Sequence, residues 1–414
     1  MKRSVALVAV VALFVVALAA CGDDDDTTAQ SGTDTTAAST DTGSGKSVRV
    51  EVDNRTDDFN SYSIAYFPDK LTVHPGTDVK FHMNFNGEPH TVTFGSSIDK
   101  ALGIFDKLTP EQQNGPPPPE VEALKIPFVI PDDADFSDPA NVKFNQSAAQ
   151  PCFLASGETA PGAAPCDVQE AKDAFDGSQP IVNSGLLKDD DEFDVKLADD
   201  LAPGTYSWIC LFHGPEMRGE ITVVADSAKA DSAADVKKAG DSQLDAIVAK
   251  VKPELEKARS GAKPGEVKAG AGTEDAPMEA TEFSPKEITV KAGTPITWNL
   301  SFHTVSFNMS EDARTDIAQD SDGTWHFNAK TFTPVGYTPP PPPAGGGGDG
   351  PPSSDAPPPP TNVDGGSWDG TGSFNSGSIG ADGDVFFKLT ITKPGTYPYV
   401  CLLHPDMEGV VKVT

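Results

Sequence analysis

Basic residues are scarce in this chain. Its 414 residues include 31 Lys and Arg against 62 Asp and Glu, which gives a formal net charge of −31. A charge of this sign and size repels the phosphates of nucleic acid, so we expect no nucleic-acid partner. It also keeps a protein in solution and attracts cationic partners, although much of it can simply be solvated surface.

Long hydrophobic runs are lacking too, except at the N-terminus. Residues 5–20 are all apolar and follow Lys2 and Arg3. The run is short for a membrane span but typical of a secretory signal peptide, which we place at residues 1–20. The following sequence, Leu18-Ala-Ala-Cys21, resembles a bacterial lipobox. The resemblance implies lipidation of Cys21 and anchoring to the extracytoplasmic face of a bacterial membrane. An ordinary secreted protein with Cys21 left over is the alternative.

Aliphatic side chains are nearly missing from residues 22–46, which are mostly Asp, Thr, Ser, Gly and Ala. Such a segment cannot bury enough apolar surface to fold. We therefore expect residues 21–46, beginning with the lipidated cysteine, to form a disordered tether.

Cysteine and histidine number only five and seven, yet they recur in one arrangement. Cys210-Leu-Phe-His213 is followed by Met217, and Cys401-Leu-Leu-His404 is followed by Met407. A thiolate, an imidazole and a thioether together favour copper, and a His2Cys set with a weak axial Met is typical of a blue-copper site. Each set needs a second histidine.

The chain supplies that histidine twice, in matching surroundings. His90 begins His-Thr-Val-Thr-Phe, and His303 begins His-Thr-Val-Ser-Phe. Upstream residues align at a constant offset of 217: Pro68 with Pro285, Gly76 with Gly293, and Phe81 with Trp298. A repeat of this length predicts two copies of one domain.

Strand alternation supports the same assignment, because successive strand residues point to opposite faces. His90 is in phase with Val92 and Phe94, and Cys210 is in phase with Trp208 and Tyr206. The second copy repeats the pattern, so we expect each ligand on the apolar face of its strand.

These motifs resemble the plastocyanin/azurin group of cupredoxins, over residues 47–225 and 276–414. The resemblance implies an all-β fold of two Greek-key β-sandwich domains, each with one type 1 copper ion. It assigns the metal ligands His90, Cys210, His213, Met217, His303, Cys401, His404 and Met407. The Cys-x2-His-x3-Met spacing of the first copy makes Met217 the least regular ligand. The resemblance also implies that His213 and His404 lie near the surface as electron exits, each ringed by apolar side chains.

Other segments separate and interrupt the two domains. We expect a first insertion at about 96–182 and a disordered Pro/Gly-rich insertion at about 310–372. Residues 226–275 are the linker between the domains. Within them, helical spacing from Leu244 to Leu255 predicts an amphipathic helix packed on a domain, or else a free spacer. Pro253 should end or kink that helix, and residues 261–274 are a glycine-rich linker.

The remaining cysteines and histidines have simpler interpretations. With Cys21, Cys210 and Cys401 assigned, Cys152 and Cys166 are left over in an exported protein. They are expected to form a disulfide, with two free thiols as the alternative. His74, His82 and His326 are read as strand-surface or loop residues.

The sequence thus predicts an exported copper protein that passes single electrons between redox partners, such as cytochromes or membrane electron-transfer complexes. Copper storage or delivery is an alternative. A copper-nitrite-reductase-like enzyme is a weaker one, because no histidine directly precedes either copper-site cysteine and no His-x-His occurs. On this ground we expect the chain not to be an enzyme.

Overall fold

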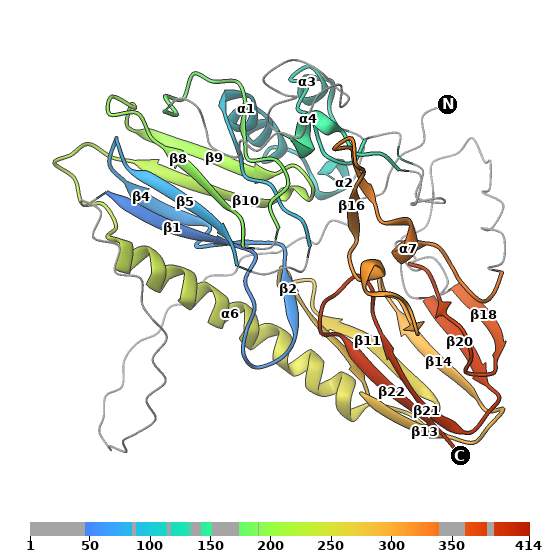
Figure 1. Ribbon diagram of the computed structural model, residues 1–414. Coiled ribbons are helices and arrows are strands. Elements are labelled where there is room, and N and C mark those ends of the chain that lie inside the picture. Colours follow the sequence, from blue (N-terminus) through green and yellow to red (C-terminus); the bar gives the residue numbers. More distant parts are fainter. Residues whose placement is uncertain are drawn as a thin grey trace, which may run out of the picture.

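Two β-sandwiches stand side by side, joined by a long helix (Figure 1). The computed structural model describes residues 46–84, 88–113, 117–131, 134, 142–150, 174–188, 190–338, 361–378 and 385–414. Cys21, Cys152 and Cys166 lie outside these residues, as does the signal segment, so the predicted lipidation, disulfide and export stay predictions. Among the described residues, no helix has the length and apolarity needed to cross a bilayer.

The first domain has two sheets. One, in the order β3-β1-β5-β8, contains β1 (Ser47–Val52), β3 (Tyr66–Phe67), β5 (Asp78–Met83) and β8 (Glu192–Lys196). The other, in the order β4-β10-β9-β6-β7, contains β4 (Lys70–Val73), β6 (Thr93–Phe94), β7 (Val182–Asn183), β9 (Gly204–Cys210) and β10 (Gly214–Val223).

The second domain repeats this plan with one borrowed strand. Its larger sheet, in the order β18-β20-β14-β11-β12-β2, contains β11 (Glu266–Gly272), β12 (Met278–Ser284), β14 (Pro295–Leu300), β18 (Thr361–Trp368) and β20 (Val385–Ile391). The last strand of that sheet, β2 (Ser61–Ser63), comes from the first domain. The facing sheet, in the order β13-β22-β21-β15-β19, contains β13 (Glu287–Val290), β15 (Ser306–Phe307), β19 (Phe374–Asn375), β21 (Gly395–Val400) and β22 (Glu408–Val413). The predicted all-β, two-domain fold is therefore confirmed.

Aromatic side chains fill both sandwiches at equivalent places. Trp208 is fully buried and meets Phe81 and Phe94 at centroid distances of 5.4 Å each. In the second domain Tyr399 meets Trp298 at 5.7 Å and Phe307 at 5.4 Å. Burying one such ring contributes roughly 1.5–3 kcal/mol, so these clusters fix the sheets that carry the ligand turns.

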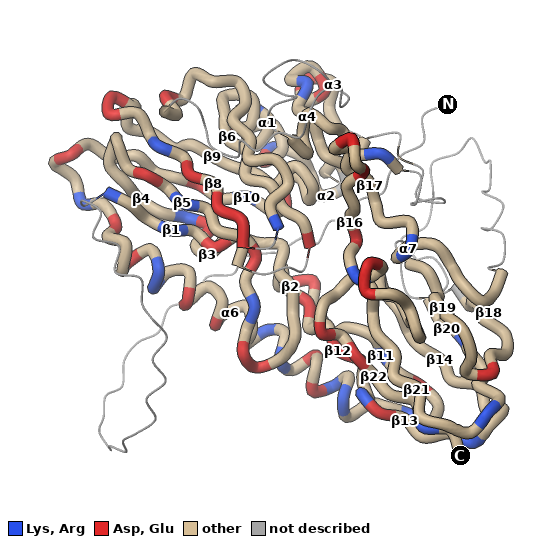
Figure 2. Tube along the Cα trace, viewed as in Figure 1, with Lys and Arg blue, Asp and Glu red and all other residues tan. Residues whose placement is uncertain are grey.

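Helix α6 (Ala233–Ser260) begins at Ser232, whose side chain and that of Asp235 form a reciprocal capping box. Its buried face contacts β1, β3, β11 and β12, and so reaches both domains (Figure 1). Acidic and basic residues are interspersed along the helix (Figure 2). The predicted packed helix is confirmed. Of the two effects expected at Pro253, an end or a kink, the end is not seen, since the helix continues to Ser260. Tertiary packing offsets the one helical hydrogen bond that proline cannot make.

The insertions are more structured than composition suggested. The first carries the helices α1 (Ser96–Phe105), α2 (Pro110–Gln113), α3 (Pro119–Glu122) and α4 (Gln146–Ala149). The second, expected to be disordered over 310–372, forms η2 (Glu311–Ala313), β16 (Ile317–Gln319), β17 (Trp325–Phe327), α7 (Ala329–Phe332) and β18 in its described parts. Its Pro- and Gly-rich middle, 339–360, lies outside the described residues, so disorder there stays a prediction. The glycine-rich stretch expected as linker, 261–274, contains β11. Pairing with neighbouring strands stabilises β11 and β18 despite the weak strand preference of their glycine-containing sequences.

Candidate metal centres

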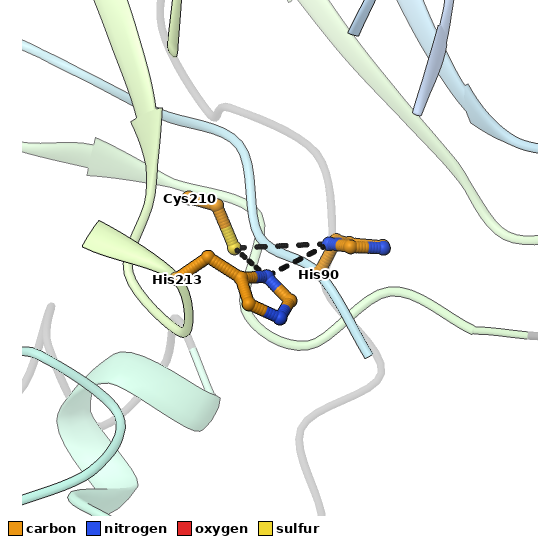
Figure 3. A group of neighbouring side chains, drawn as sticks. All are labelled: His90, Cys210 and His213. Atoms are coloured by element: carbon orange, nitrogen blue, oxygen red, sulfur yellow. Dashed lines mark hydrogen bonds between the residues drawn. The ribbon is translucent and has the colours of Figure 1, made fainter. Parts of the chain in front are cut away.

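The first candidate centre gathers three side chains from two parts of the first domain. His90 lies just before β6, Cys210 ends β9, and His213 lies in the turn that leads into β10. Figure 3 shows the Cys210 sulfur and a nitrogen of each imidazole pointing toward one another. The Nδ1 atoms of His90 and His213 are 3.2 Å apart, and Cys210 Sγ lies 4.0 and 3.5 Å from them respectively.

The second centre has the same geometry. The Nδ1 atoms of His303 and His404 are 2.9 Å apart, and Cys401 Sγ lies 3.8 and 3.5 Å from them respectively. In each group the three ligand atoms lie within 4.8 Å of one another. Three ligands bound at roughly 2.0–2.3 Å around one ion would stand about 3.5–4 Å apart. The sulfur–nitrogen distances lie in this range, and the two nitrogen–nitrogen distances are shorter.

One buried methionine follows each ligand turn, Met217 after His213 and Met407 after His404. Met217 and Met407 are each 1% exposed. Met407 lines a small pocket together with Cys401 and His404, and its carbonyl accepts a 2.9 Å hydrogen bond from the Cys401 amide. Met217 packs in the same core cluster as Cys210. Each methionine is thus buried in the core cluster that holds the cysteine of its own centre.

Main-chain amides hold each sulfur in place. The Thr91 and Phe212 amides donate to Cys210 Sγ at 3.3 and 3.4 Å, and the Thr304 amide donates to Cys401 Sγ at 3.4 Å. Both donors, Thr91 and Thr304, directly follow a ligand histidine in the chain. Amide donors of this kind stabilise the thiolate form, which is the form that binds a metal.

A second pair of residues braces the histidine strands. The Ser184 hydroxyl accepts the Val92 amide at 2.8 Å, and the Ser376 hydroxyl accepts the Val305 amide at 2.8 Å. The preceding residues, Asn183 and Asn375, each accept a hydroxyl hydrogen bond from the same histidine strand. The two insertions therefore rejoin their domains through the same hydrogen bonds.

Charge favours a cation at both centres. Burial opposes a charged Cys210, but the His213 and His90 imidazoles outweigh it and hold the pKa of that thiol well below its usual range. Cys401 behaves in the same way between His404 and His303. Burial likewise opposes a charged His213 or His404, but the adjacent thiolate and Glu88 raise the pKa of each imidazole to about 10. The surroundings therefore stabilise positive charge where the ligand atoms converge, and the soft sulfur with two imidazoles suits copper.

Carboxylates that were not predicted from the sequence stand behind the imidazoles. Asp53 Oδ2 lies 3.5 Å from His90 Nε2, and Glu279 Oε1 lies 3.1 Å from His303 Nε2. Glu88 Oε2 lies 2.9 Å from His213 Nε2. A carboxylate on the remote nitrogen fixes the orientation of a ligand histidine. The repeat did not reveal them, because at the offset of 217 Glu279 aligns with Tyr62 and Asp53 aligns with Gly270.

The expected surface exits are not at the surface. His404 is 2% exposed, and the His213 side chain is 13% exposed. Phe212, expected in an apolar ring open to partners, instead packs against Phe144 of the first insertion and Phe327 of the second. The expectation is wrong because the two domains bury these turns against each other and against the insertions.

The other histidines stay apart from both centres. His82 lies between Glu51 and Asp190, at 2.7 and 2.5 Å. His326 Nε2 lies 3.3 Å from Asp320, and His74 Nδ1 lies 3.4 Å from the Val224 carbonyl. His82 is buried rather than superficial, since its two carboxylate partners satisfy both ring nitrogens.

No protein-family model and no curated protein matches the chain. Solved structures do. Reduced auracyanin from Roseiflexus castenholzii covers 44% of this chain and 99% of its own length, at 14% identity and a TM-score of 0.20. A copper-containing nitrite reductase from Thermus scotoductus covers 89% of this chain and 98% of its own length, at 11% identity and a TM-score of 0.21. A blue copper oxidase from Nitrosomonas europaea covers 89% of this chain and 86% of its own length, at 11% identity and a TM-score of 0.17. At these identities the likeness concerns the fold alone.

This comparison corrects one prediction. The chain was expected not to be an enzyme, yet the structures similar to it over 89% of its length include a nitrite reductase and oxidases. The prediction rested on missing dipeptide and His-x-His motifs. That reasoning was too strict, because ligands assemble in space from distant segments and a fold of this kind does not fix one function. The two groups of one cysteine and two histidines agree with the coarser statement that this is a copper-binding redox protein.

Proposed function

We propose that this chain is an extracytoplasmic electron-transfer protein with two type 1 copper sites, one in each β-sandwich. His90, Cys210 and His213 would hold the first ion and His303, Cys401 and His404 the second, with Met217 and Met407 as weak axial ligands. The observation that carries the proposal is the twofold convergence of one thiolate and two imidazole nitrogens within 4.8 Å.

Copper, when bound, supplies one-electron exchange at each site. The protein's contribution is to keep the ligand side chains in fixed positions and shielded from solvent. Cys210 is fully buried, Cys401 is 3% exposed, and the amide donors keep each sulfur in one position. A ligand set that cannot rearrange suits both oxidation states of the ion, so little has to move when the charge changes.

Burial also bears on the storage alternative. His90 and His303 are fully buried, and their remote nitrogens face Asp53 and Glu279. Handing copper to another protein requires an accessible ion and ligands that release it. Enclosed, braced ligands favour retention, so electron transfer is the better supported function.

Location and partners form part of the proposal. The apolar run before Cys21 supports export and a lipid anchor in the membrane. The strongly negative chain would attract redox proteins with a basic docking face, such as cytochromes or membrane electron-transfer complexes.

The test is spectroscopic. Copper-loaded protein is expected to show an intense blue thiolate-to-copper band, a narrow copper hyperfine splitting in its EPR spectrum, and reversible one-electron voltammetry. Rapid loss of copper to a weak chelator would favour delivery instead. Turnover of nitrite or oxygen by the same sample would show catalysis in addition to electron transfer.

A further inference from the structure

One buried carboxylate touches both ligand sets. Glu88 is 9% exposed, and its Oε2 lies 2.9 Å from His213 Nε2. Its other oxygen, Oε1, lies 3.8 Å from His404 Nε2. The Nδ1 atoms of the same two imidazoles point at their own cysteines, so a single carboxylate separates the backs of two candidate metal centres.

The contact crosses from one domain to the other. Glu88 lies two residues before His90 in the first domain, whereas His404 belongs to the second. Tyr62 of the first domain stacks on the His404 ring at 4.8 Å with an 8° interplanar angle. Its hydroxyl donates to Glu279 Oε2 at 3.2 Å, and the other oxygen of Glu279 meets His303. The first domain therefore supports both histidines of the second centre.

Main-chain pairing fixes this arrangement. Strand β2 of the first domain pairs with β12 of the second in the register Tyr62 opposite Glu279. The Asn60 side chain donates to the Asp406 carbonyl at 2.8 Å, beside the second ligand turn. Glu88 thus faces a site whose position is set by several independent contacts.

A buried carboxylate is destabilising unless it is paired, so this one needs its histidine partners. Its Oε2 accepts a 2.9 Å hydrogen bond from His213 Nε2, while the His404 imidazole stands 3.8 Å from Oε1. When His213 is fixed as a metal ligand, its Nε2–H has one direction and Glu88 is fixed with it. The same carboxylate then stands ready for His404.

We propose that Glu88 is a positioning residue that couples the two centres, so that metal in one site raises the metal affinity of the other. This rests on the proposed function only in taking both ligand sets as metal sites. The coupling comes from shared ordering: the first ion orders Glu88, and the second binds to a partner that is already ordered. By linkage the effect is reciprocal, and couplings of this kind typically lie at about 5- to 150-fold.

The experiment uses cobalt(II) as the probe, because its thiolate charge-transfer band reports each site without redox chemistry. Cobalt affinity at the second site is measured in the full chain with the first site filled, and in Cys210→Ser, where the first site is disabled. The reverse comparison uses Cys401→Ser. We expect a difference of about fivefold or more in each direction.

Variants of Glu88 test the cause. In Glu88→Ala the difference should vanish while each site still binds cobalt, and in Glu88→Gln it should shrink. Glu216→Gln is the matched control, because Glu216 lies near His213 but is exposed. It should leave the coupling unchanged. Circular dichroism melting establishes that each variant is folded, and Glu88→Gln keeps the test open if Glu88→Ala does not fold.

Each outcome has one meaning. Equal affinities with the neighbouring site filled or disabled, or a coupling that survives in Glu88→Ala and Glu88→Gln, would overturn the role of Glu88. Absence of a thiolate charge-transfer band with either cobalt or copper would instead sink the proposed function.

Discussion

Asp53 of the first domain and Gly270 of the second occupy equivalent positions beside a ligand histidine. They are related by the repeat offset of 217, and both have positive φ, 56° and 73°. Asp53 places its own carboxylate near His90 Nε2. At Gly270 a side chain would collide with His303 Nε2 and Glu279, because Glu279 supplies the carboxylate there. The two domains thus support equivalent histidines with carboxylates from different strands.

Substituting Gly270 should therefore damage the second centre selectively. In Gly270→Ala the new methyl group must displace Glu279 or His303, and we expect roughly tenfold to hundredfold weaker copper binding there. Gly293→Ala is the control, since Gly293 has a φ of 79° but nothing within 4 Å of an added Cβ. Both variants carry a backbone cost of about 1–2 kcal/mol. Equal copper affinity in the two would contradict the account.

Removing one thiolate should remove one centre. Cys401→Ser replaces the soft ligand of the second site, so copper per chain should fall by one ion and part of the blue absorbance should disappear. Cys210→Ser should do the same at the first site, and the double variant should be colourless. Retention of the full visible spectrum in either single variant would show that the assigned sulfur is not a ligand.

Asp316 should make stability fall as pH rises. Burial, followed by the charge of Glu88, raises the pKa of Asp316 to about 7, above its unfolded value of about 3.9. Between these values the folded chain holds a proton that the unfolded chain has lost. The unfolding free energy should therefore decrease from about pH 4 to about pH 7, by as much as ~4 kcal/mol.

Urea unfolding of copper-depleted protein between pH 4.5 and 8 measures this decrease. Asp316→Asn cannot lose a proton and should show a flatter dependence on pH. Other groups titrate in both proteins, so the difference between the two curves is the quantity to compare. Parallel curves would rule out Asp316 as the cause.

Helix α6 should separate from the first domain when Gly240 is enlarged. A Cβ at Gly240 would stand 3.0 Å from the Phe67 backbone, so a leucine there cannot fit without moving the helix. We expect Gly240→Leu to lower the unfolding free energy by about 1–3 kcal/mol and to speed trypsin cleavage within α6. The neighbouring Ala239 is exposed, and Ala239→Leu should stay within about 0.5 kcal/mol of the parent. Equal effects of the two variants would place the helix contact elsewhere.

The ligand histidines and cysteines could be proposed from sequence because local rules determine them. Strand alternation places Cys210 on the face that holds Trp208, and the repeat identifies His90 and His303 as counterparts. Burial in β10 follows that alternation, with Met217 in phase with Ile221 and Val223. At the end of β9 the opposite face is covered too, so Ile209 is buried between Trp208 and Cys210. These features depend on neighbours within one domain.

Features created by docking of the domains could not be predicted in the same way. Glu88 and Glu279 are acidic and would be placed on a surface by composition alone. Glu88 is buried and Glu279 is half-buried. Their contacts across the domain boundary, Glu88 with His404 and Glu279 with Tyr62, form where β2 joins the sheet of the other domain. Strands β11 and β18 were missed for a related reason, since their glycine-rich sequences form strands only through pairing with neighbouring strands.

The most direct test of the central claim is the copper count and EPR spectrum of one purified sample. We expect about two copper ions per chain, both with the narrow hyperfine splitting of type 1 sites, and loss of one signal in each single cysteine variant. A colourless protein at full copper loading, or copper that binds equally well when Cys210 and Cys401 are both replaced by serine, would contradict the account.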